Sequence, residues 1–223
     1  MTQVFITGGT GYVGRRLIPV LQRQGCTVRA LVRAGSEKRL PPGCDVVIGN
    51  ALDRTTFEAS IEPDSTFVQL VGVPHPSPAK ERQFYEIDLV SAKASIDAAK
   101  ARAVDHFVYV SVAQPAPVMK AYQTSRAIAE GHLAHAELTY TILRPWYVLG
   151  PGHRWPYVLK PFYWLAERRA STRASALRLG LVTIDQMVAT LALVVAAPPK
   201  SSRIVTVPEI RRISLEGAVQ PSP

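Results

Sequence analysis

Three glycines, Gly8, Gly11 and Gly14, recur at every third position near the start of the chain. They follow the apolar run 4–6 and precede a segment, 15–21, that has an amphipathic helical pattern. Glycine adopts backbone angles that other residues resist, and its missing Cβ lets a phosphate approach the peptide N–H groups at a helix N-terminus. The spacing therefore predicts a turn that binds a pyrophosphate. The alternative is a tight turn that binds no ligand.

A basic cluster lies about 20 residues beyond the turn, where an NAD-preferring site usually offers Asp or Glu to the ribose hydroxyls. This position holds Arg33 instead. Two further basic residues and one acid follow it: Lys38, Arg39 and Glu37. Because a guanidinium group can bind a phosphate through two parallel hydrogen bonds, Arg33 predicts NADP in preference to NAD. The alternative for Arg33 is a solvated strand end.

The rest of the sequence alternates apolar runs of strand length with helical patterns. Strands are expected at 4–6, 27–32, 45–48, 66–71, 106–111, 139–143 and 204–207. Helices are expected at 15–21, 81–101, 118–136 and 183–197. The expected buried face of the second helix consists of Phe84, Ile87, Val90 or Ser91, Ala94 and Ala98. Repeated β–α units of this kind predict an α/β protein with a Rossmann-type, doubly wound parallel sheet and helices on both faces.

Composition sets the expected organisation and location. With 223 residues and 47% hydrophobic content, the chain has enough apolar side chains for one substantial core. We expect a single NAD(P)-binding Rossmann domain over 1–213, with a short lid at about 146–178, and a loose tail at 214–223. Because the first strand begins close to Met1, no signal peptide is expected and a cytoplasmic location is predicted. The two cysteines have no metal-like spacing, so no metal site is predicted.

Several motifs occur at the ends of the expected strands. They are the three glycines of the turn, Leu70-Val71-Gly72, Ser111, Tyr122 on the next helix, and Leu143-Arg144-Pro145-x-x-Val148-x-Gly150-Pro151-Gly152. Together they resemble the short-chain dehydrogenase/reductase superfamily, in its extended or atypical branch near the nucleotide-sugar epimerases and NmrA-type proteins. The resemblance covers about 2–152 and becomes weaker beyond that segment.

The resemblance implies an NAD(P) cofactor that is bound along the ends of the strands. The implied contacts come from the glycine turn and from the residues that follow four other strands: Gly8, Thr10, Gly11, Tyr12, Val13, Gly14, Arg33, Asn50, Ala51, Val71, Gly72 and Pro145. Asn50 has the position whose side chain reads the adenine edge, although the family more often has Asp there.

The resemblance also implies catalytic residues. In the superfamily a tyrosine is the general acid/base, a lysine four residues later supports its anion and holds the nicotinamide ribose, and a serine or threonine polarises the substrate. Here Tyr122 and Ser111 match, but Arg126 replaces the lysine. Since residues four apart share one face of a helix, Arg126 is expected beside Tyr122. The alternatives are a core aromatic for Tyr122 and a strand-end hydroxyl that satisfies the backbone for Ser111.

Two functions are consistent with these residues. The first is an NADP(H)-binding oxidoreductase, or an epimerase/dehydratase-like enzyme, that acts on a small carbonyl or hydroxyl substrate. The second is a sensor, regulator or assembly protein that binds NADP(H) without turnover. The replacement of the family's lysine by Arg126 keeps the second function open.

The segment 146–178 is rich in aromatic and basic residues. It contains all three tryptophans of the chain, and it has six arginine or lysine residues against a single acid, Glu167. In extended members of the superfamily the substrate-binding part follows the sixth strand, so this segment is expected to be a lid over an anionic or ring-bearing small molecule. The alternatives are contact with an anionic membrane surface or a protein and, last, contact with nucleic acid. The nucleic-acid alternative rests on the basic residues interleaved with aromatics and on the net charge of +9.

Overall fold

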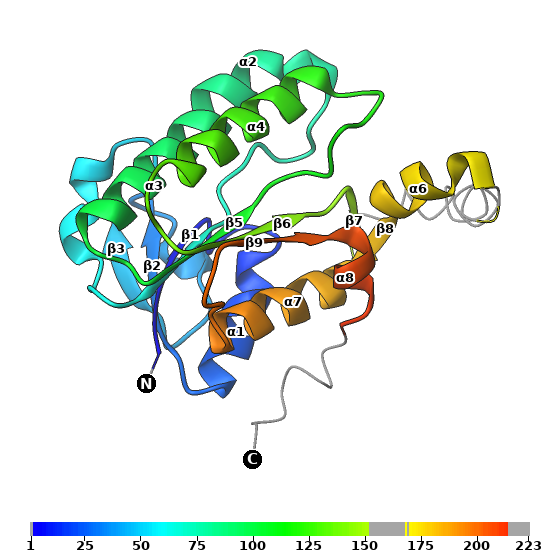
Figure 1. Cartoon of the computed structure of the whole chain (residues 1–223). Coiled ribbons are helices and arrows are strands. Elements are labelled where there is room, and N and C mark those ends of the chain that lie inside the picture. Colours follow the sequence, from blue (N-terminus) through cyan, green and yellow to red (C-terminus); the bar gives the residue numbers. More distant parts are fainter. Residues whose placement is uncertain (1, 152–167, 169, 214–223) are drawn as a thin grey trace.

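Seven parallel strands form one sheet in the computed structural model, which describes residues 2–151, 168 and 170–213 (Figure 1). The strand order is β3-β2-β1-β4-β5-β6-β9, and every pairing within it is parallel. The bounds are Gln3–Thr7 for β1, Thr27–Val32 for β2, Asp45–Ile48 for β3, Thr66–Gln69 for β4, His106–Val110 for β5, Tyr140–Arg144 for β6 and Arg203–Thr206 for β9. The order reverses at β1, from which the chain builds the sheet first to one side and then to the other. The expected Rossmann-type α/β fold is therefore confirmed.

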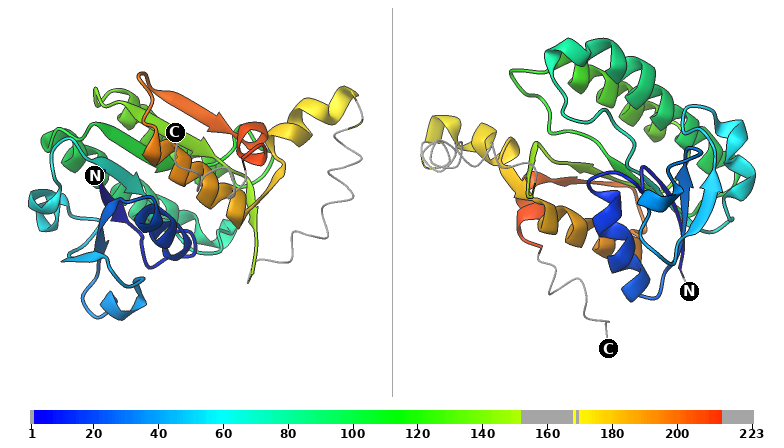
Figure 2. Two further views of the ribbon diagram at one scale, coloured as in Figure 1. Left: turned by 90° about the horizontal axis from the view of Figure 1, so that it is seen from below. Right: turned by 180° about the vertical axis from the view of Figure 1, so that it is seen from behind.

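Helices cover both faces of this sheet (Figure 1). On one face lie α1 (Gly14–Arg23) and α7 (Ile184–Ala196), whose buried side chains include Leu17 and Leu191. On the other face lie α3 (Val90–Ala101) and α4 (Lys120–Ala134), where Ile96 and Leu133 are fully buried. Figure 2 shows α1 and α7 side by side from below the sheet. The sheet therefore has an apolar core on each side, as near-continuous apolar strands require.

A second, two-stranded parallel sheet lies beside the main one. It pairs β7 (Tyr147–Leu149) with β8 (Leu181–Thr183), and the short helix α8 (Val207–Arg211) packs against β8. These two strands were not predicted, because three residues are too few for a strand pattern to be distinguished. A capping box begins α7, the helix expected at 183–197: the Gln186 N–H donates to Thr183 Oγ1 at 3.1 Å, and the Thr183 N–H donates to Gln186 Oε1 at 2.9 Å.

The helix expected over 81–101 is not regular. It begins with α2 (Glu81–Gln83), continues as the π-helical segment η5 (Phe84–Leu89), and only then becomes α3. A π turn bonds residues five apart, so it rotates the following side chains relative to an α-helix. Of the two alternatives in the predicted buried face, Ser91 is buried and Val90 is 39% exposed; Asp88, which the prediction did not include, is also buried.

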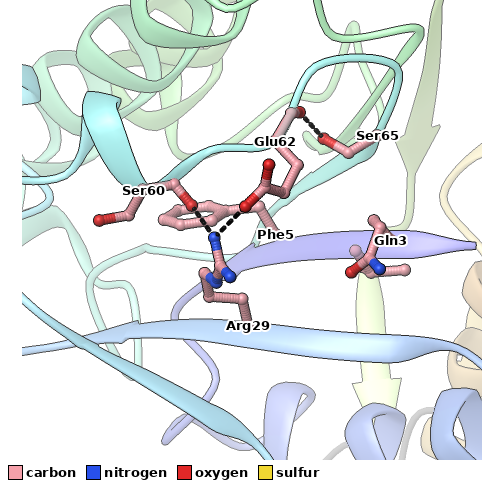
Figure 3. Close-up of a pocket in the computed structure, with 7 residues that line it drawn as sticks. Gln3, Phe5, Arg29, Ser60, Glu62 and Ser65 are labelled. Atoms are coloured by element: carbon pink, nitrogen blue, oxygen red, sulfur yellow. Dashed lines mark hydrogen bonds and ion pairs between the residues drawn. The ribbon is translucent and has the colours of Figure 1, made fainter.

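Phenylalanine rings pack against one another in the core between the sheet and α3. The Phe67 ring lies 5.2 Å from the ring of Phe5 on one side and 5.2 Å from the ring of Phe107 on the other. Beside Phe5, Arg29 donates to the carbonyl of Ser60 at 2.7 Å and to Glu62 at 2.8 Å (Figure 3). Arg29, Ser60 and Glu62 line a small open pocket of about 10 Å³, which is at the lower limit for one water molecule. The pocket is therefore too small for a cofactor or substrate.

The outer strands of the main sheet, β3 and β9, carry exposed β-branched residues. Val46 and Ile48 on β3 are 47% and 58% exposed, and Ile204 on β9 is 40% exposed. The short 3₁₀ segments that follow β2, β3 and β4 are η1 (Glu37–Arg39), η2 (Arg54–Thr56), η3 (Glu58–Ser60) and η4 (Pro78–Lys80). Among the described residues, no helix is long and apolar enough to cross a lipid bilayer. The expected tail and much of the expected lid, 152–167 and 169, lie outside the described residues.

A buried histidine makes the stability of this sheet dependent on pH. His106 is fully buried at the start of β5, where its Nε2 lies 2.9 Å from Thr141 Oγ1. Burial, with a contribution from the positive charge of Arg203, lowers the pKa of His106 from 6.5 to about 4. As the pH falls below 6.5, His106 is protonated in the unfolded chain but stays neutral in the folded chain, which favours the unfolded chain. The free energy of unfolding therefore has its full value above pH 6.5 and decreases toward pH 4.

We expect the wild-type protein to lose about 3 kcal/mol of unfolding free energy from this group between those two pH values. The variant His106→Gln should lack this part of the acid dependence, since glutamine does not titrate. Urea unfolding of both proteins between pH 4 and pH 6.5 measures the difference between their unfolding free energies. The contribution of the carboxylates is common to both proteins and cancels in this difference. The control is His75→Gln, which makes the same substitution at an exposed histidine. Identical slopes for His106→Gln and wild type would show that His106 is not the titrating group.

Candidate cofactor and active site

The glycine turn connects β1 to α1 and packs against the end of β4. Gly8 has a φ of +76°, and a Cβ on it would lie 2.7 Å from the carbonyl carbon of Leu70. A Cβ on Gly14 would lie 2.6 Å from the carbonyl oxygen of Gly8. Both glycines are therefore required by the packing of the turn itself. Gly11 differs because it is exposed, and a Cβ on it would meet only the Gly8 carbonyl oxygen, at 3.0 Å. Its open side is where a ligand can approach the backbone.

The start of α1 is suited to an anion. Its first turn contains Arg15 and Arg16 and no acid, and Val13 at the N-cap makes no side-chain capping bond. Arg16 lies over the ring of Tyr12, 4.2 Å from its centre, and donates to the Tyr12 carbonyl at 2.9 Å. Because a helix N-terminus carries partial positive charge, added arginines are unfavourable there unless an anion is bound. Thr10 is half-buried within the same turn.

Arg33 follows β2 directly and is exposed, and its side chain makes no hydrogen bond or ion pair with the described residues. Lys38 and Arg39, in η1, are exposed nearby. The one acid in this segment, Glu37, accepts a hydrogen bond from the Gly35 N–H at 3.0 Å. Backbone N–H groups of Glu37 and Gly35 lower the pKa of Glu37. The end of β2 therefore presents positive charge to the solvent.

The other expected cofactor contacts also follow the carboxyl ends of strands, which is where ligands bind in open parallel sheets. After β3, Asn50 is exposed and its side-chain oxygen accepts from the Leu52 N–H at 3.1 Å, while Ala51 is half-buried. After β4, the Val71 N–H donates to Gln69 and Gly72 is exposed. After β6, Pro145 is buried and accepts from the Ala113 N–H at 2.8 Å. Their contacts with a cofactor stay predictions.

Tyr122 and Arg126 lie side by side on α4, as their spacing predicts. The guanidinium carbon of Arg126 is 5.2 Å from the centre of the Tyr122 ring. The other side of Tyr122 contacts Phe84 of η5, whose ring centre is 5.0 Å away. Tyr122 is half-buried, whereas the Arg126 side chain is only 6% exposed.

Arg126 is held by three partners from other elements. It donates to Asp88 Oδ2 at 2.9 Å, to the Tyr109 hydroxyl at 3.2 Å and to the Val110 carbonyl at 3.0 Å. Burial alone lowers the pKa of Arg126, but the negative charge of its neighbours outweighs burial and raises it. Burial raises the pKa of Asp88, and Arg126 opposes that effect. The positive charge next to Tyr122 is therefore shared with a buried carboxylate.

Ser111 is engaged elsewhere on α4. Its hydroxyl donates to Glu130 Oε1 at 2.5 Å, and its N–H donates to the Leu143 carbonyl at 2.8 Å. Glu130 is also paired with Arg144, whose Nε lies 3.1 Å from Oε1. The described hydrogen bonds thus connect Ser111 to Glu130, and none connects it to Tyr122 or Arg126. A role for Ser111 toward substrate stays a prediction.

The sequence analysis did not identify Asp88, Tyr109 or Glu130 as residues of this site. Two signals were present. Asp88 is an acid in the middle of an apolar helix face, and a fully buried carboxylate needs a partner. Glu130 follows Arg126 by four residues, so Tyr122, Arg126 and Glu130 form one row along α4.

A groove of about 460 Å³ lies along α4 near this row. Its lining residues are Gln114, Pro115, Lys120, Gln123, Thr124, Ala127 and Arg144. Arg178, at the end of α6 (Ala170–Arg178), donates to the Pro115 carbonyl at 3.2 Å. At the other end of the expected lid, the rings of Trp146 and Tyr147 meet edge to face at 5.4 Å. The described end of the lid segment thus reaches the rim of the groove.

Comparison with known proteins gives three informative similarities. The ceramide reductase of Caulobacter vibrioides is 29% identical over 160 residues, covering 67% of this chain and 47% of the reductase. A 4-hydroxy-2-methyl-3-oxo-4-farnesyl-3,4-dihydroquinoline-1-oxide ketoreductase of Stigmatella aurantiaca is 24% identical over 178 residues, covering 75% and 52%. The chain spans about half the length of these curated relatives. The Bordetella bronchiseptica enzyme WbmH, solved with NAD⁺, has the same fold, with a TM-score of 0.69 at 20% identity over 94% of this chain and 79% of WbmH.

A family model described as NAD(P)H-binding matches residues 8–158. The match includes the glycine turn, the ends of β2 to β6, and the Tyr122–Arg126 pair. It therefore covers the elements that form the candidate site and more than half of the chain. The chain therefore belongs to this NAD(P)H-binding family.

Proposed function

We propose that the protein is an NADP(H)-dependent reductase that acts on a carbonyl group, or on the corresponding hydroxyl in the reverse direction. The observation that carries this proposal is Tyr122, half-buried between Arg126 and Phe84 near the start of α4. A phenol in this position can give a proton to a bound oxygen, and the adjacent guanidinium supports the charge that remains. Because both relatives are named as reductases, they favour hydride transfer over epimerase or dehydratase chemistry.

The residues of the glycine turn fit a dinucleotide phosphate. The exposed, uncrowded side of Gly11 leaves room for a pyrophosphate against the backbone, and the uncapped first turn of α1 offers it positive charge. Arg33, with Lys38 and Arg39 beside it, is suited to the additional phosphate that distinguishes NADP from NAD. We therefore assign NADP to this chain in preference to NAD.

The proposed chemistry is divided between the cofactor and this chain. NADPH, when bound, supplies a hydride to the carbonyl carbon. The Tyr122 hydroxyl protonates the carbonyl oxygen, and the resulting phenolate recovers a proton from solvent. Arg126 supports this phenolate from 5.2 Å, measured between its guanidinium carbon and the ring centre. In this proposal Ser111 polarises the carbonyl only if its hydroxyl turns away from Glu130.

The substrate that we propose carries a long chain or a ring system next to its carbonyl group. Both relatives are named for molecules of this kind, a ceramide and a farnesylated quinoline. The groove along α4 offers amide, hydroxyl and basic side chains for the polar end of such a molecule. The aromatic and basic segment 146–178 would cover the apolar part, and the bond from Arg178 to Pro115 at the rim of the groove supports this arrangement.

The choice of cofactor gives a direct test. We expect NADPH to bind at least ~10-fold more tightly than NADH, a difference of about 1.4 kcal/mol. Arg33→Asp should remove or reverse this preference, because a carboxylate repels the additional phosphate. Calorimetric titration of both cofactors measures the ratio. The control Arg23→Asp makes the same charge change at the far end of α1 and should leave the ratio unaltered. Equal affinities of the wild-type protein for both cofactors would contradict the assignment of NADP.

A second function is favoured by a separate observation. Two expected catalytic groups are already occupied: Arg126 is paired with Asp88, and the Ser111 hydroxyl is donated to Glu130. Such internal pairing suits a protein that binds NADP(H) and reports or transmits its presence without turnover. Screening of long-chain ketones, quinones and nucleotide sugars with NADPH distinguishes the two functions. Oxidation of NADPH by one of these compounds favours the reductase, and tight binding without oxidation favours the sensor.

A further inference from the structure

A buried set of hydrogen bonds connects the glycine turn to Asp88. Thr7, the last residue of β1, donates to Gln69 Oε1 at 2.5 Å, and Gln69 Nε2 lies 3.2 Å from Ser91 Oγ. The Ser91 hydroxyl in turn donates to the Asp88 carbonyl at 3.1 Å. Thr7, Gln69 and Ser91 are each at most 1% exposed, so water does not compete for these hydrogen bonds.

The Asp88 carboxylate then fixes two further segments. Its Oδ1 accepts from the Val73 N–H at 2.7 Å, which holds the chain that follows β4. Its Oδ2 accepts from Arg126 Nη2 at 2.9 Å, which holds the guanidinium group. The Asp88 side chain is 0% exposed, so both bonds are made away from solvent. Asp88 lies in the π-helical segment η5, which packs against α4.

The guanidinium group lies directly against Gly72. A Cβ on Gly72 would be 2.7 Å from Arg126 Nη2, so the guanidinium occupies the space next to the exposed end of β4. Arg126 Nη1 donates hydrogen bonds to the Tyr109 hydroxyl and to the Val110 carbonyl. A further donor, Nε, is buried and has no partner among the described residues. A buried N–H without a partner is costly, which points to a group that completes it.

The position of Gly72 relative to the switch in strand order suggests which group this is. Ligands of open parallel sheets lie across the carboxyl ends of the strands at such a switch, which here is between β1 and β4. If Arg33 at the end of β2 binds the adenosine half of NADP, the other half extends past β4 and β5, over Gly72. We propose that Asp88 is a positioning residue, which does not touch the cofactor and instead orients Arg126 for the nicotinamide half. This inference rests on the proposed binding of NADP(H).

The variant Asp88→Asn tests the inference. Asparagine keeps an oxygen for the Val73 N–H, but its NH₂ group then opposes the guanidinium NH₂ and releases Arg126. We expect NADPH to bind ~10-fold more weakly, while 2′,5′-ADP, which lacks the nicotinamide half, binds as it does to the wild-type protein. Calorimetric titration with both ligands gives the two ratios. The control Ser95→Ala alters a buried polar residue of α3, one turn beyond Ser91, and should change neither affinity.

The outcomes separate this inference from the proposed function. If Asp88→Asn binds NADPH and 2′,5′-ADP more weakly by the same factor, Asp88 is merely structural. If its NADPH affinity is unchanged, Asp88 does not orient Arg126. Either result overturns the inference and leaves the proposed function standing. Failure of the wild-type protein to bind either ligand overturns the proposed function and the inference with it. If Asp88→Asn does not fold, Tyr109→Phe replaces it. This variant removes a single acceptor of Arg126 and should cause a smaller loss, again for NADPH alone.

Discussion

Replacing Tyr122 by phenylalanine is expected to reduce turnover by ~10²–10⁴-fold, which is the usual contribution of a general acid/base. The affinity for NADPH should stay within about twofold, because the ring that packs between Arg126 and Phe84 is retained and only the hydroxyl is lost. Steady-state oxidation of NADPH with a ketone or quinone found by screening measures the first effect. Calorimetry in the absence of substrate measures the second.

The matched control for this experiment is Tyr85→Phe. Tyr85 is half-buried on the neighbouring segment η5, so its variant loses a hydroxyl from a similar environment and should keep wild-type turnover. If Tyr122→Phe is as active as the control, the proton comes from another group and the proposed mechanism is wrong. If a broad screen yields no activity in a protein that binds NADPH tightly, the binding function is favoured.

Gly11→Val is expected to abolish cofactor binding, a loss of at least ~1,000-fold or about 4 kcal/mol. The branched side chain would occupy the open side of the turn, where the pyrophosphate must approach the backbone. The fold should survive, since Gly11 is exposed and its N–H bond to Gly8 is a backbone bond. Thermal unfolding and calorimetric titration of one preparation measure both properties.

The control for the glycine turn is Gly131→Val on α4. Gly131 is exposed with open space around it, so its variant should bind NADPH as the wild-type protein does. Gly14→Val is the opposite case, because its Cβ would collide with the Gly8 carbonyl and should destabilise the fold itself. Normal binding by a folded Gly11→Val protein would mean that the phosphates lie elsewhere.

The strand positions could be predicted because a parallel strand that is covered on both faces must be apolar along its whole length. The runs that became β1, β2 and β5 needed no knowledge of their partners. The adjacency of Tyr122 and Arg126 was also predictable, since helix geometry alone brings residues four apart together. The capping box of α7 is also a local feature, since Thr183 and Gln186 are only three residues apart.

The partners of these residues could not be predicted, because they depend on tertiary packing. Asp88 meets Arg126 across 38 residues of sequence, and it does so from the π-helical segment η5, which packs against α4. A regular helix through the same residues left Val90 and Ser91 as alternatives for the buried face, and the structure shows Ser91 buried and Val90 exposed. The bond between Ser111 and Glu130 likewise joins a strand end to a helix that the sequence identified separately.

The exposed β-branched residues on β3 and β9 have a consequence for the behaviour of the protein in solution. An uncovered strand with residues such as Val46 and Ile48 is a template onto which another chain can add a strand. Mutual repulsion between molecules with a net charge of +9 opposes this addition. That repulsion extends over only about 10 Å at 0.1 M salt. Colloidal stability of the protein is thus governed by ionic strength, separately from the free energy of its fold.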